Sequence, residues 1–536
     1  MASVETEWTT LLSGAYETLD LFTKGKGIGN IASDFLNEMY HPQEILHDSE
    51  KRNTIIGIMP RDYAEYLGNR LKINWKNVDE LYTSLKKINY NSTSERIFLE
   101  FFGIEPLKKY KEEEVIGVER LSKDLLGYPL RSYQHQILSD LKQIFEKGSR
   151  RCMIHMPTGS GKTRTAMYYI SELLNSDKEQ MVLWLAYSKE LCDQASEEFK
   201  KTWTIRGSKE ASIFRFYGKS DCVLPSKKTN GIIITTLSKI LAAKKKDSTA
   251  LSILSNKIDL VLFDEAHQIV APRYESIVND VVQLNDKSKL IGLTATPGRT
   301  WDDPLEDEKL SSFFYHNIVS LKTDSNESPN AMLTRTGYLS KIEWIHCECE
   351  CPVLTSNELN LIKKLRDDGD IPPSVLNKLS TDAKRNAKIL SEIELLLQKQ
   401  HKRILLFATS VEHARIMTGI LKIFVNKYDC SVDCIDSSTN KGLREIIIKN
   451  FKSDDTRPHI LCNYGVLTTG FDAPNVDAGV IARPTKSLVL FSQMVGRMIR
   501  GPKTKGGTER ATIVSVVDVN LPGFKDAYNN WTDVWK

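Results

Sequence analysis

The sequence predicts an α/β protein with two parallel-sheet domains behind a smaller, mainly helical N-terminal region. Three observations lead to this class. Short, continuous apolar runs, typical of strands buried on both faces, alternate with helical stretches. This series occurs twice, within residues 116–300 and again within residues 341–536. At 536 residues the chain is also too long for a single hydrophobic core.

The first series contains a glycine-rich loop within residues 151–165, R-C-M-I-H-M-P-T-G-S-G-K-T-R-T. The apolar run 152–154 predicts the end of a buried strand, and the stretch that starts at Thr165 predicts a helix. Strand, glycine-rich loop and helix are the context of a phosphate-binding loop. Met156 stands where the strict pattern has its first glycine, so the loop alone also fits an ordinary turn.

We expect this loop to hold the phosphates of ATP. The Lys162 ammonium would reach the β- and γ-phosphates, and the Thr163 hydroxyl would ligate Mg²⁺. The nucleotide-binding residues predicted from the loop are Pro157, Thr158, Gly159, Ser160, Gly161, Lys162 and Thr163.

Two carboxylates follow the apolar run 260–263. Asp264, at the tip of a buried strand beside the phosphate loop, is placed to hold Mg²⁺, usually through water. Glu265 points differently and can orient or deprotonate an attacking water. Polar clusters also follow the other apolar runs of this series. In parallel sheets, ligands lie beyond the carboxyl ends of the strands, so we expect these groups to meet at one edge.

Residues 127–134, G-Y-P-L-R-S-Y-Q, precede the phosphate loop by about twenty residues. A glutamine here can accept from adenine N6 and donate to N7 while an aromatic ring stacks on the base. We assign Gln134 to the first role and Tyr128 or Tyr133 to the second, and count Arg131 among the nucleotide contacts. The pattern fits equally well with tyrosines in the core and a surface glutamine.

Composition limits the possible partners. The net charge is only +4, so a nucleic-acid track has to be a local arrangement of basic and hydroxyl groups. The N-terminus has no signal sequence, and no apolar run approaches the ~20 residues of a membrane helix. Nine cysteines in so long a chain are typical of reduced thiols, which predicts a cytoplasmic protein, or a nuclear one in a eukaryote.

Three cysteines, Cys347, Cys349 and Cys351, alternate with other residues along one predicted strand. At a period of two, their thiols share one face and are poorly placed to surround a tetrahedral metal. We therefore expect a half-buried strand in which cysteine acts as a small hydrophobe, with zinc as the alternative.

The remaining parts carry no readable motif. Residues 1–115 show amphipathic helical patterns at 79–88 and 94–102, which predict a helical accessory domain whose role is opaque and which could bind a protein partner. Residues 301–340 include an acidic, irregular piece at 301–308 and predict a linker.

The motifs P-T-G-S-G-K-T, D-E-A-H and L-T-A-T-P-G-R, in this order, resemble motifs I, II and III of superfamily 2 helicases. In the second series, T-G-F-D-A-P-N-V-D and Q-M-V-G-R-M-I-R resemble motifs V and VI. The motif sequences most resemble those of one branch, which holds the XPB-type repair helicases, the phage helicase UvsW and the motor subunits of type I and III restriction enzymes. The resemblance covers about residues 125–520. It implies two tandem RecA-like lobes, lobe 1 at 116–300 and lobe 2 at 341–536.

Motif VI supplies the predicted second half of the ATP site. Arg497 and Arg500 are three residues apart, so on a helix they share one face and could reach a γ-phosphate held by lobe 1. Gln493 can join the water or the γ-phosphate. The resemblance also makes Gly470 and Asp472 candidates for coupling the nucleotide to nucleic acid.

The resemblance implies a nucleic-acid track across the carboxyl edges of both lobes. Its predicted contacts are Ser188, Lys189, Thr235, Thr236, Thr409, Ser410, Thr468 and Thr469. Such contacts reach phosphates and carry little base information. The predicted function is an ATP-dependent DNA helicase or translocase, with DNA favoured over RNA by resemblance alone.

Two other functions stay open at this point. The chain could be an ATP-hydrolysing sensor or remodeller of nucleic acid, a subunit of a defence, restriction or repair complex that does not separate strands. No P-D…(D/E)-x-K nuclease signature is found in the sequence, so cutting would need a partner. A non-catalytic scaffold is disfavoured because Lys162, Asp264 and Glu265 are all in place.

Overall fold

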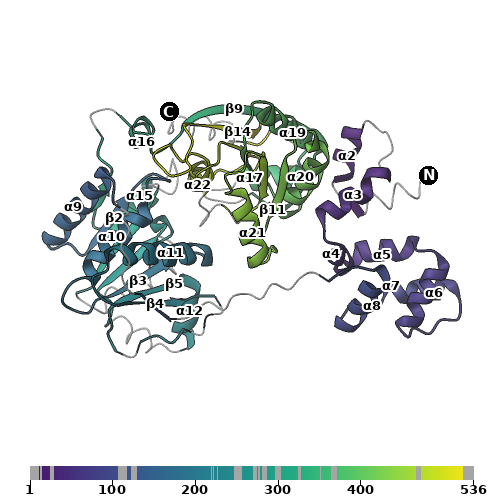
Figure 1. Ribbon diagram of the computed structural model, residues 1–536, viewed down its shortest axis with the longest axis horizontal. Helices are drawn as coiled ribbons and strands as arrows, with labels where there is room; N and C mark the ends of the chain where they lie inside the picture. The colour runs from purple at the N-terminus through teal and green to yellow at the C-terminus, as the bar shows by residue number, and fades with distance from the viewer. Residues whose placement is uncertain are drawn as a thin grey trace.

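The protein is described here by a computed structural model (Figure 1). The structure describes residues 11–12, 15–23, 29–106, 118–121, 129–218, 220, 222–225, 227–246, 256–269, 275, 278–279, 287–295, 304–323, 327–350, 352–363, 371–465, 467 and 473–522.

Lobe 1 is built on an eight-stranded sheet with the order β1-β4-β5-β3-β6-β7-β2-β8. All neighbouring strands are parallel except β1 and β4. The strands are β1 Val118–Leu121, β2 Arg151–His155, β3 Met181–Ala186, β4 Ala211–Phe216, β5 Gly231–Thr236, β6 Leu260–Asp264, β7 Lys289–Thr294 and β8 Ile318–Ser320. The central strands are buried on both faces, as their continuous apolar sequences require.

Lobe 2 is built on a six-stranded, wholly parallel sheet with the order β11-β12-β10-β13-β14-β9. The strands are β9 Lys341–Cys349, β10 Arg403–Phe407, β11 Ser431–Ile435, β12 His459–Asn463, β13 Ala478–Ile481 and β14 Arg510–Asp518. Two parallel-sheet α/β domains confirm the predicted fold class.

Helices cover both sheets (Figure 1). Those of lobe 1 are α9 Ser132–Glu146, α10 Lys162–Leu174, α11 Lys189–Arg206, α12 Leu237–Lys246, α15 Pro304–Phe313 and α16 Pro329–Arg335. Those of lobe 2 are α17 Ser356–Lys363, α18 Pro373–Thr381, α19 Ala383–Gln398, α20 Val411–Phe424, α21 Lys441–Phe451 and α22 Leu488–Met498.

The predicted linker, residues 301–340, contains regular structure. Helix α15 begins at Pro304, inside the piece that the sequence predicts to be irregular. Strand β8 follows and pairs in parallel with β2 at the edge of the lobe 1 sheet, where Val319 is buried. Residues 304–320 are therefore part of lobe 1 rather than a linker.

The N-terminal region consists of two parts with different partners. Helices α2 (Ala15–Thr23) and α3 (Gly29–Met39) pack on α19 and α20 of lobe 2, as Figure 1 shows. We call the described residues between 11 and 45 the N-terminal arm. Its residues Leu12, Leu19 and Phe35 are fully buried in the lobe 2 core. The arm is therefore a layer of lobe 2 and not part of a separate domain.

The second part, residues 46–104, we call the helical module. It contains α5 Ser49–Ile58, α6 Arg61–Arg70, α7 Val78–Lys86 and α8 Ser92–Phe102, and the short helix α4 (Pro42–His47) joins it to the arm. The module has its own hydrophobic core, with Ile56, Leu67, Leu81 and Phe98 at its centre. The helical patterns predicted at 79–88 and 94–102 correspond to α7 and α8.

The cysteines on β9 behave as predicted. Cys347 and Cys349 are buried in the lobe 2 core, with their Sγ atoms 3.9 Å apart. Cys351 lies outside the described residues. No group of three or more His, Cys, Asp or Glu side chains suited to a metal occurs in the part of the chain that the structure describes.

No helix among the described residues combines the length and the hydropathy needed to cross a membrane.

Candidate nucleotide site between the two lobes

The glycine-rich loop connects β2 to α10 at the carboxyl edge of the lobe 1 sheet. Gly159 and Gly161 have φ angles of +85° and +88°, which glycine adopts without a steric penalty. Gly161 is also the N-cap of α10, so the loop leads directly into the positive end of a helix. The buried Thr158 Oγ1 makes no hydrogen bond within the described part of the chain. The loop has the geometry of a phosphate-binding loop.

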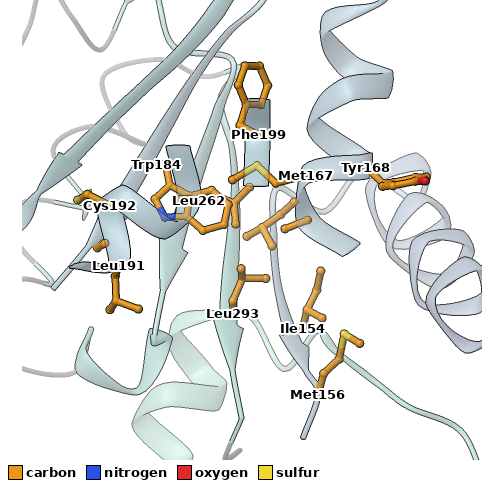
Figure 2. Close-up of a cluster of buried hydrophobic side chains, with 14 of the residues drawn as sticks. Ile154, Met156, Met167, Tyr168, Trp184, Leu191, Cys192, Phe199, Leu262 and Leu293 are labelled. Carbon is orange, nitrogen blue, oxygen red and sulfur yellow. The ribbon is translucent and has the colours of Figure 1, made fainter. Parts of the chain in front are cut away.

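Met156 explains why the first glycine of the pattern is dispensable here. Its side chain is fully buried in the lobe 1 core together with Ile154 and Leu293, as Figure 2 shows. Its N–H donates to the Thr294 carbonyl at 3.0 Å, which ties the start of the loop to β7. The position therefore contributes packing, and the two later glycines supply the turn.

Strand β6 brings two carboxylates to the loop. Asp264 ends the strand and is 5% exposed. Glu265 follows with φ at +56°, a left-handed conformation that residues other than glycine seldom adopt. His267 Nδ1 lies 3.5 Å from Glu265 Oε2. A strained non-glycine residue beside a buried carboxylate is typical of a functional site.

Lys162, Asp264 and Glu265 form one electrostatic cluster. Burial and the neighbouring Glu265 charge raise the pKa of Asp264 to about 7, against the opposing effect of the Lys162 charge. Burial also lowers the pKa of Lys162, which the two carboxylates raise. The cluster thus holds an acidic group at a cost that a bound cation would relieve.

The oxygen donors fit the magnesium ion that this fold implies. Thr163 stands in the first turn of α10, and Asp264 is a buried carboxylate with a raised pKa. Hydroxyl and carboxylate oxygens are the ligands Mg²⁺ prefers, commonly through water. Thr163 and Asp264 are therefore the residues that would hold the ion.

The residues predicted to bind adenine form hydrogen bonds with the phosphate loop. Gln134 is fully buried; its Nε2 donates to the carbonyls of Ser160 at 3.2 Å and Gly161 at 3.3 Å. Its Oε1 accepts from the Arg131 N–H at 2.9 Å. Tyr133 is buried as well, and its hydroxyl donates to the Ser160 carbonyl at 2.8 Å. A surface glutamine is therefore excluded.

The adenine contact itself stays a prediction. In this conformation, Gln134 supports the phosphate loop with both ends of its amide, so binding adenine would require at least one of these bonds to change. Tyr128 lies outside the described residues.

Helix α22 of lobe 2 lies against this loop. A Cβ atom at Gly496 would collide with Thr158 Cγ2, and a Cβ atom at Gly159 would collide with Arg500 Nη1. The charges of Arg497 and Arg500 both lower the pKa of Lys162. The structure thus brings motif VI of lobe 2 onto the phosphate loop of lobe 1, although more than 300 residues separate them in the sequence. Gln493, half-buried, is on the same helix.

The two arginines do not share a helix face as predicted. Helix α22 ends at Met498, and Arg500 forms an antiparallel bridge with Leu339 instead. Pro502 follows two residues later and cannot continue a helix. A Cβ atom at Gly501 would lie 2.5 Å from the Gly337 carbonyl oxygen, so this segment is pressed against the chain that enters β9. Arg500 therefore approaches Gly159 from an extended segment.

Sequence reasoning missed an aromatic contact that joins the lobes. The Arg131 guanidinium lies 4.0 Å from the centre of the Tyr338 ring, and the Lys503 ammonium lies 5.0 Å from it. Tyr133 meets the same ring edge-on at 5.6 Å, and Arg131 Nη2 donates to Thr504 Oγ1 at 3.3 Å. A lone tyrosine in T-R-T-G-Y-L carries no signal in the sequence that marks it as an interface residue.

The predicted nucleic-acid contacts fall into three groups. Ser188, Lys189 and Ser410 lie at carboxyl ends of strands, where the two serines cap α11 and α20. Thr235 and Thr409 are fully buried, so their hydroxyls do not face solvent as predicted. Thr236 is also buried, at 7% exposed, and its hydroxyl lies 3.1 Å from that of the exposed Ser238. Four predicted residues lie outside the described residues: Thr468, Thr469, Gly470 and Asp472.

Two family models match the chain. Residues 127–299 match the model described as "Type III restriction enzyme, res subunit", and residues 385–501 match "Helicase conserved C-terminal domain". The chain belongs to the superfamily 2 helicases. This family consists of ATP-driven nucleic-acid motors.

Among similar proteins is the IRC3 helicase of Saccharomyces cerevisiae, 28% identical over 69% of this chain and 49% of the relative. The type I restriction enzyme EcoKI endonuclease subunit of Escherichia coli is 25% identical, over 75% of this chain and 35% of the relative. The DNA 3'-5' translocase XPB2 of Sulfurisphaera tokodaii is 22% identical, over 74% of this chain and 86% of the relative. The chain spans about half the length of IRC3. Restriction enzyme subunits and an XPB-type protein are the kinds of relative that the motif sequences predict.

Solved structures support the fold. A fragment of an HsdR subunit of a type I restriction enzyme from Vibrio vulnificus has a TM-score of 0.50 and 19% identity, over 86% of this chain and 78% of that chain. The type ISP restriction-modification enzyme LlaBIII, bound to DNA, has a TM-score of 0.51 and 17% identity, over 76% of this chain and 30% of that chain.

Proposed function

We propose that the chain is an ATP-dependent DNA translocase or helicase. The observation that carries the proposal is the approach of the two lobes. Gly496 lies on Thr158, and Arg500 lies over Gly159 beside the cluster of Lys162 and the two carboxylates. ATP hydrolysis that needs groups from both lobes can be converted into relative movement of the lobes.

Each residue of the cluster has a proposed role in hydrolysis. The backbone N–H groups from Gly159 to Thr163 hold the phosphates, and Lys162 neutralises the β- and γ-oxygens. Glu265 accepts the proton of the attacking water. Arg497 and Arg500 stabilise the charge that develops on the transferred phosphoryl group. When bound, Mg²⁺ supplies additional positive charge at the phosphate oxygens.

DNA is favoured over RNA by the relatives that are named. Type I restriction endonuclease subunits and a DNA translocase are among them, and LlaBIII was solved with DNA. The strand-end residues Ser188, Lys189 and Ser410 are the proposed phosphate contacts. Because such contacts carry little sequence information, we expect binding to tolerate any sequence.

A second candidate is a motor or sensor subunit of a restriction, defence or repair complex that moves on DNA without separating strands. The similarity to the EcoKI and EcoAI subunits favours it. In this case the helical module, with its own core next to lobe 2, is the proposed site for a protein partner.

ATP hydrolysis measured with single-stranded, duplex and forked DNA and with duplex RNA tests the proposal. We expect a DNA to raise the rate, and Glu265→Gln protein to bind ATP without turnover. A wild-type rate in Glu265→Gln protein would remove Glu265 from its role. A wild-type protein that no nucleic acid stimulates would overturn the motor function.

Two further assays separate the two candidates. A translocase displaces a triplex-forming strand from duplex DNA, whereas a helicase also separates a forked duplex. Displacement without fork separation would favour the second candidate, and separation of the fork would favour the helicase.

A further inference from the structure

Three neighbouring strand ends form one surface on lobe 1. Strands β4, β5 and β3 are adjacent and parallel, with Ala186 beside Thr236 and Phe216 beside Thr235. The residues that follow these strands therefore emerge together at the carboxyl edge of the sheet. We call residues 187–189, 216–218 and 236–239 the strand-end surface.

Tyr187 is the unusual member of this surface. It directly follows the six fully buried residues of β3, yet it is 55% exposed. Other exposed tyrosines have partners: Tyr63 and Tyr66 contact the Phe101 ring, and Tyr315 lies under the Arg151 guanidinium. Within the described part of the chain, Tyr187 has no ring or cation against it. An aromatic face is thus presented to solvent at the ligand-binding edge.

Basic and hydroxyl groups lie on the same strand-end surface as this ring. Lys189 is exposed and lies next to Gly218, whose backbone is left-handed at φ +62°. The Gly218 carbonyl accepts from the Lys239 ammonium at 3.1 Å, which places both lysines beside the same glycine. Ser238, exposed, adds a hydroxyl near them. Cations and an exposed aromatic ring on one surface are the combination that single-strand-binding proteins use.

We propose that Tyr187 stacks on an unpaired base of a single DNA strand whose phosphates pass over Lys189 and Lys239. The bases of a duplex are already stacked on one another, so a side chain that offers its face to a base needs one that is unpaired. The proposal rests on the proposed function and specifies its substrate: the motor engages DNA with a single-stranded part.

The position of Tyr187 places the proposed stacking site near the residues proposed to hydrolyse ATP. Strand β6 lies on the other side of β3, with Leu185 beside Phe263. Asp264 and Glu265 therefore follow Phe263 on the strand next to the one that ends at Tyr187. The backbone at Tyr187 is thus about one strand spacing, ~4.8 Å, from the chain segment that carries the proposed base.

The test compares Tyr187→Ala, Tyr187→Phe and Tyr315→Ala. Tyr315 is a matched control: it is 54% exposed but precedes β8, at the opposite edge of the same sheet. Binding is measured by fluorescence anisotropy with a labelled oligo-dT strand, an oligo-rU strand and a blunt DNA hairpin. We expect Tyr187→Ala to weaken oligo-dT binding roughly ten-fold, with Tyr187→Phe and Tyr315→Ala near wild type. Hairpin binding should not change, and a strand containing 5-iodouracil should crosslink to Tyr187.

The outcomes separate this proposal from the function on which it rests. Wild-type affinity of Tyr187→Ala for oligo-dT, or equal losses for hairpin and single strand, overturns the stacking while DNA-stimulated hydrolysis still stands. Preference for oligo-rU over oligo-dT overturns the assignment to DNA. If the wild-type protein binds no single strand, the proposed binding site at Tyr187 is wrong. If no nucleic acid stimulates ATP hydrolysis, the proposed motor function is wrong.

Discussion

The loops after β2 in lobe 1 and after β10 in lobe 2 follow strands of similar parallel sheets, but their backbone N–H groups have different acceptors. In lobe 1, two glycines turn the chain, and the N–H groups of the loop are the proposed donors to phosphate. In lobe 2, a side chain accepts from the backbone instead: His413 Nδ1 accepts from the Thr409 N–H at 3.1 Å. Burial lowers the pKa of His413 to about 3, so this acceptor is neutral.

The difference shows how one fold serves two purposes. Lobe 1 keeps its backbone donors for phosphate and places carboxylates beside them. Lobe 2 satisfies its own donors, through a buried chain from Thr409 by way of His413 to Asn386 and the arm residue Thr18. Lobe 2 then contributes Arg497 and Arg500 to the charges of the site. Changes in the phosphate loop of lobe 1 should remove binding and chemistry together, whereas changes to the arginines of lobe 2 should spare binding.

The largest effect is expected for Lys162→Ala. Removing the ammonium that neutralises the β- and γ-phosphates should reduce ATP hydrolysis about 10³-fold or more and weaken nucleotide binding as well. Steady-state hydrolysis and the binding of a fluorescent ATP analogue measure the two effects. Lys162→Arg is the matched control for charge, and full activity in it would show that any cation suffices.

Arg497→Ala and Arg500→Ala should lower the turnover number by roughly 10²- to 10³-fold, because each arginine acts on charge that develops during transfer. Nucleotide binding to lobe 1 should stay within a few-fold of wild type. Equal losses of binding and turnover would break the proposed division between the lobes.

Asp264→Asn should stabilise the metal-free protein at neutral pH. The pKa of Asp264 is about 7 in the folded protein and 3.8 when unperturbed, so between these values the folded state binds more protons and stability falls as pH rises. The variant lacks this loss and should be more stable by roughly 2 to 4 kcal/mol at pH 7.5, with no difference near pH 4. Urea unfolding in EDTA measures it, and a gap that does not depend on pH would contradict the assignment.

Gly496→Ala should impair turnover by about ten-fold, the smallest of the four effects, because the added Cβ would collide with Thr158 Cγ2 and hold the lobes apart. Thr158→Ala removes that methyl and should restore part of the activity in the double variant. Additive losses in the double variant would show that the two positions do not meet during the cycle.

Local patterns were sufficient for much of this structure. Continuous apolar runs located the central strands, and the glycine-rich loop located the phosphate site, because both depend on residues close in sequence. Strand β4, A-S-I-F-R-F, escaped prediction because polar residues interrupt it, and β8 escaped because it has three residues. Pro502 could have indicated that the helix ends before Arg500.

Other features depend on distant partners, which no local pattern reveals. The Arg131–Tyr338 stack joins two segments about 200 residues apart. The helices of the arm were predictable as helices, but their burial on lobe 2 was not, because an amphipathic pattern does not identify its partner. The burial of Thr235 and Thr409 likewise follows from the sheet and the helices around it.

The docking of the arm on lobe 2 also has a consequence for synthesis on the ribosome. The Tyr40 hydroxyl donates to Glu412, 372 residues further along the chain, and Phe35 lies against Gly419. The arm residues therefore emerge well before the residues that bury them, and their apolar side chains stay uncovered while lobe 1 is translated. Contacts so far apart in sequence form slowly and leave such surfaces open to aggregation. The arm is thus the segment where a chaperone would be needed longest.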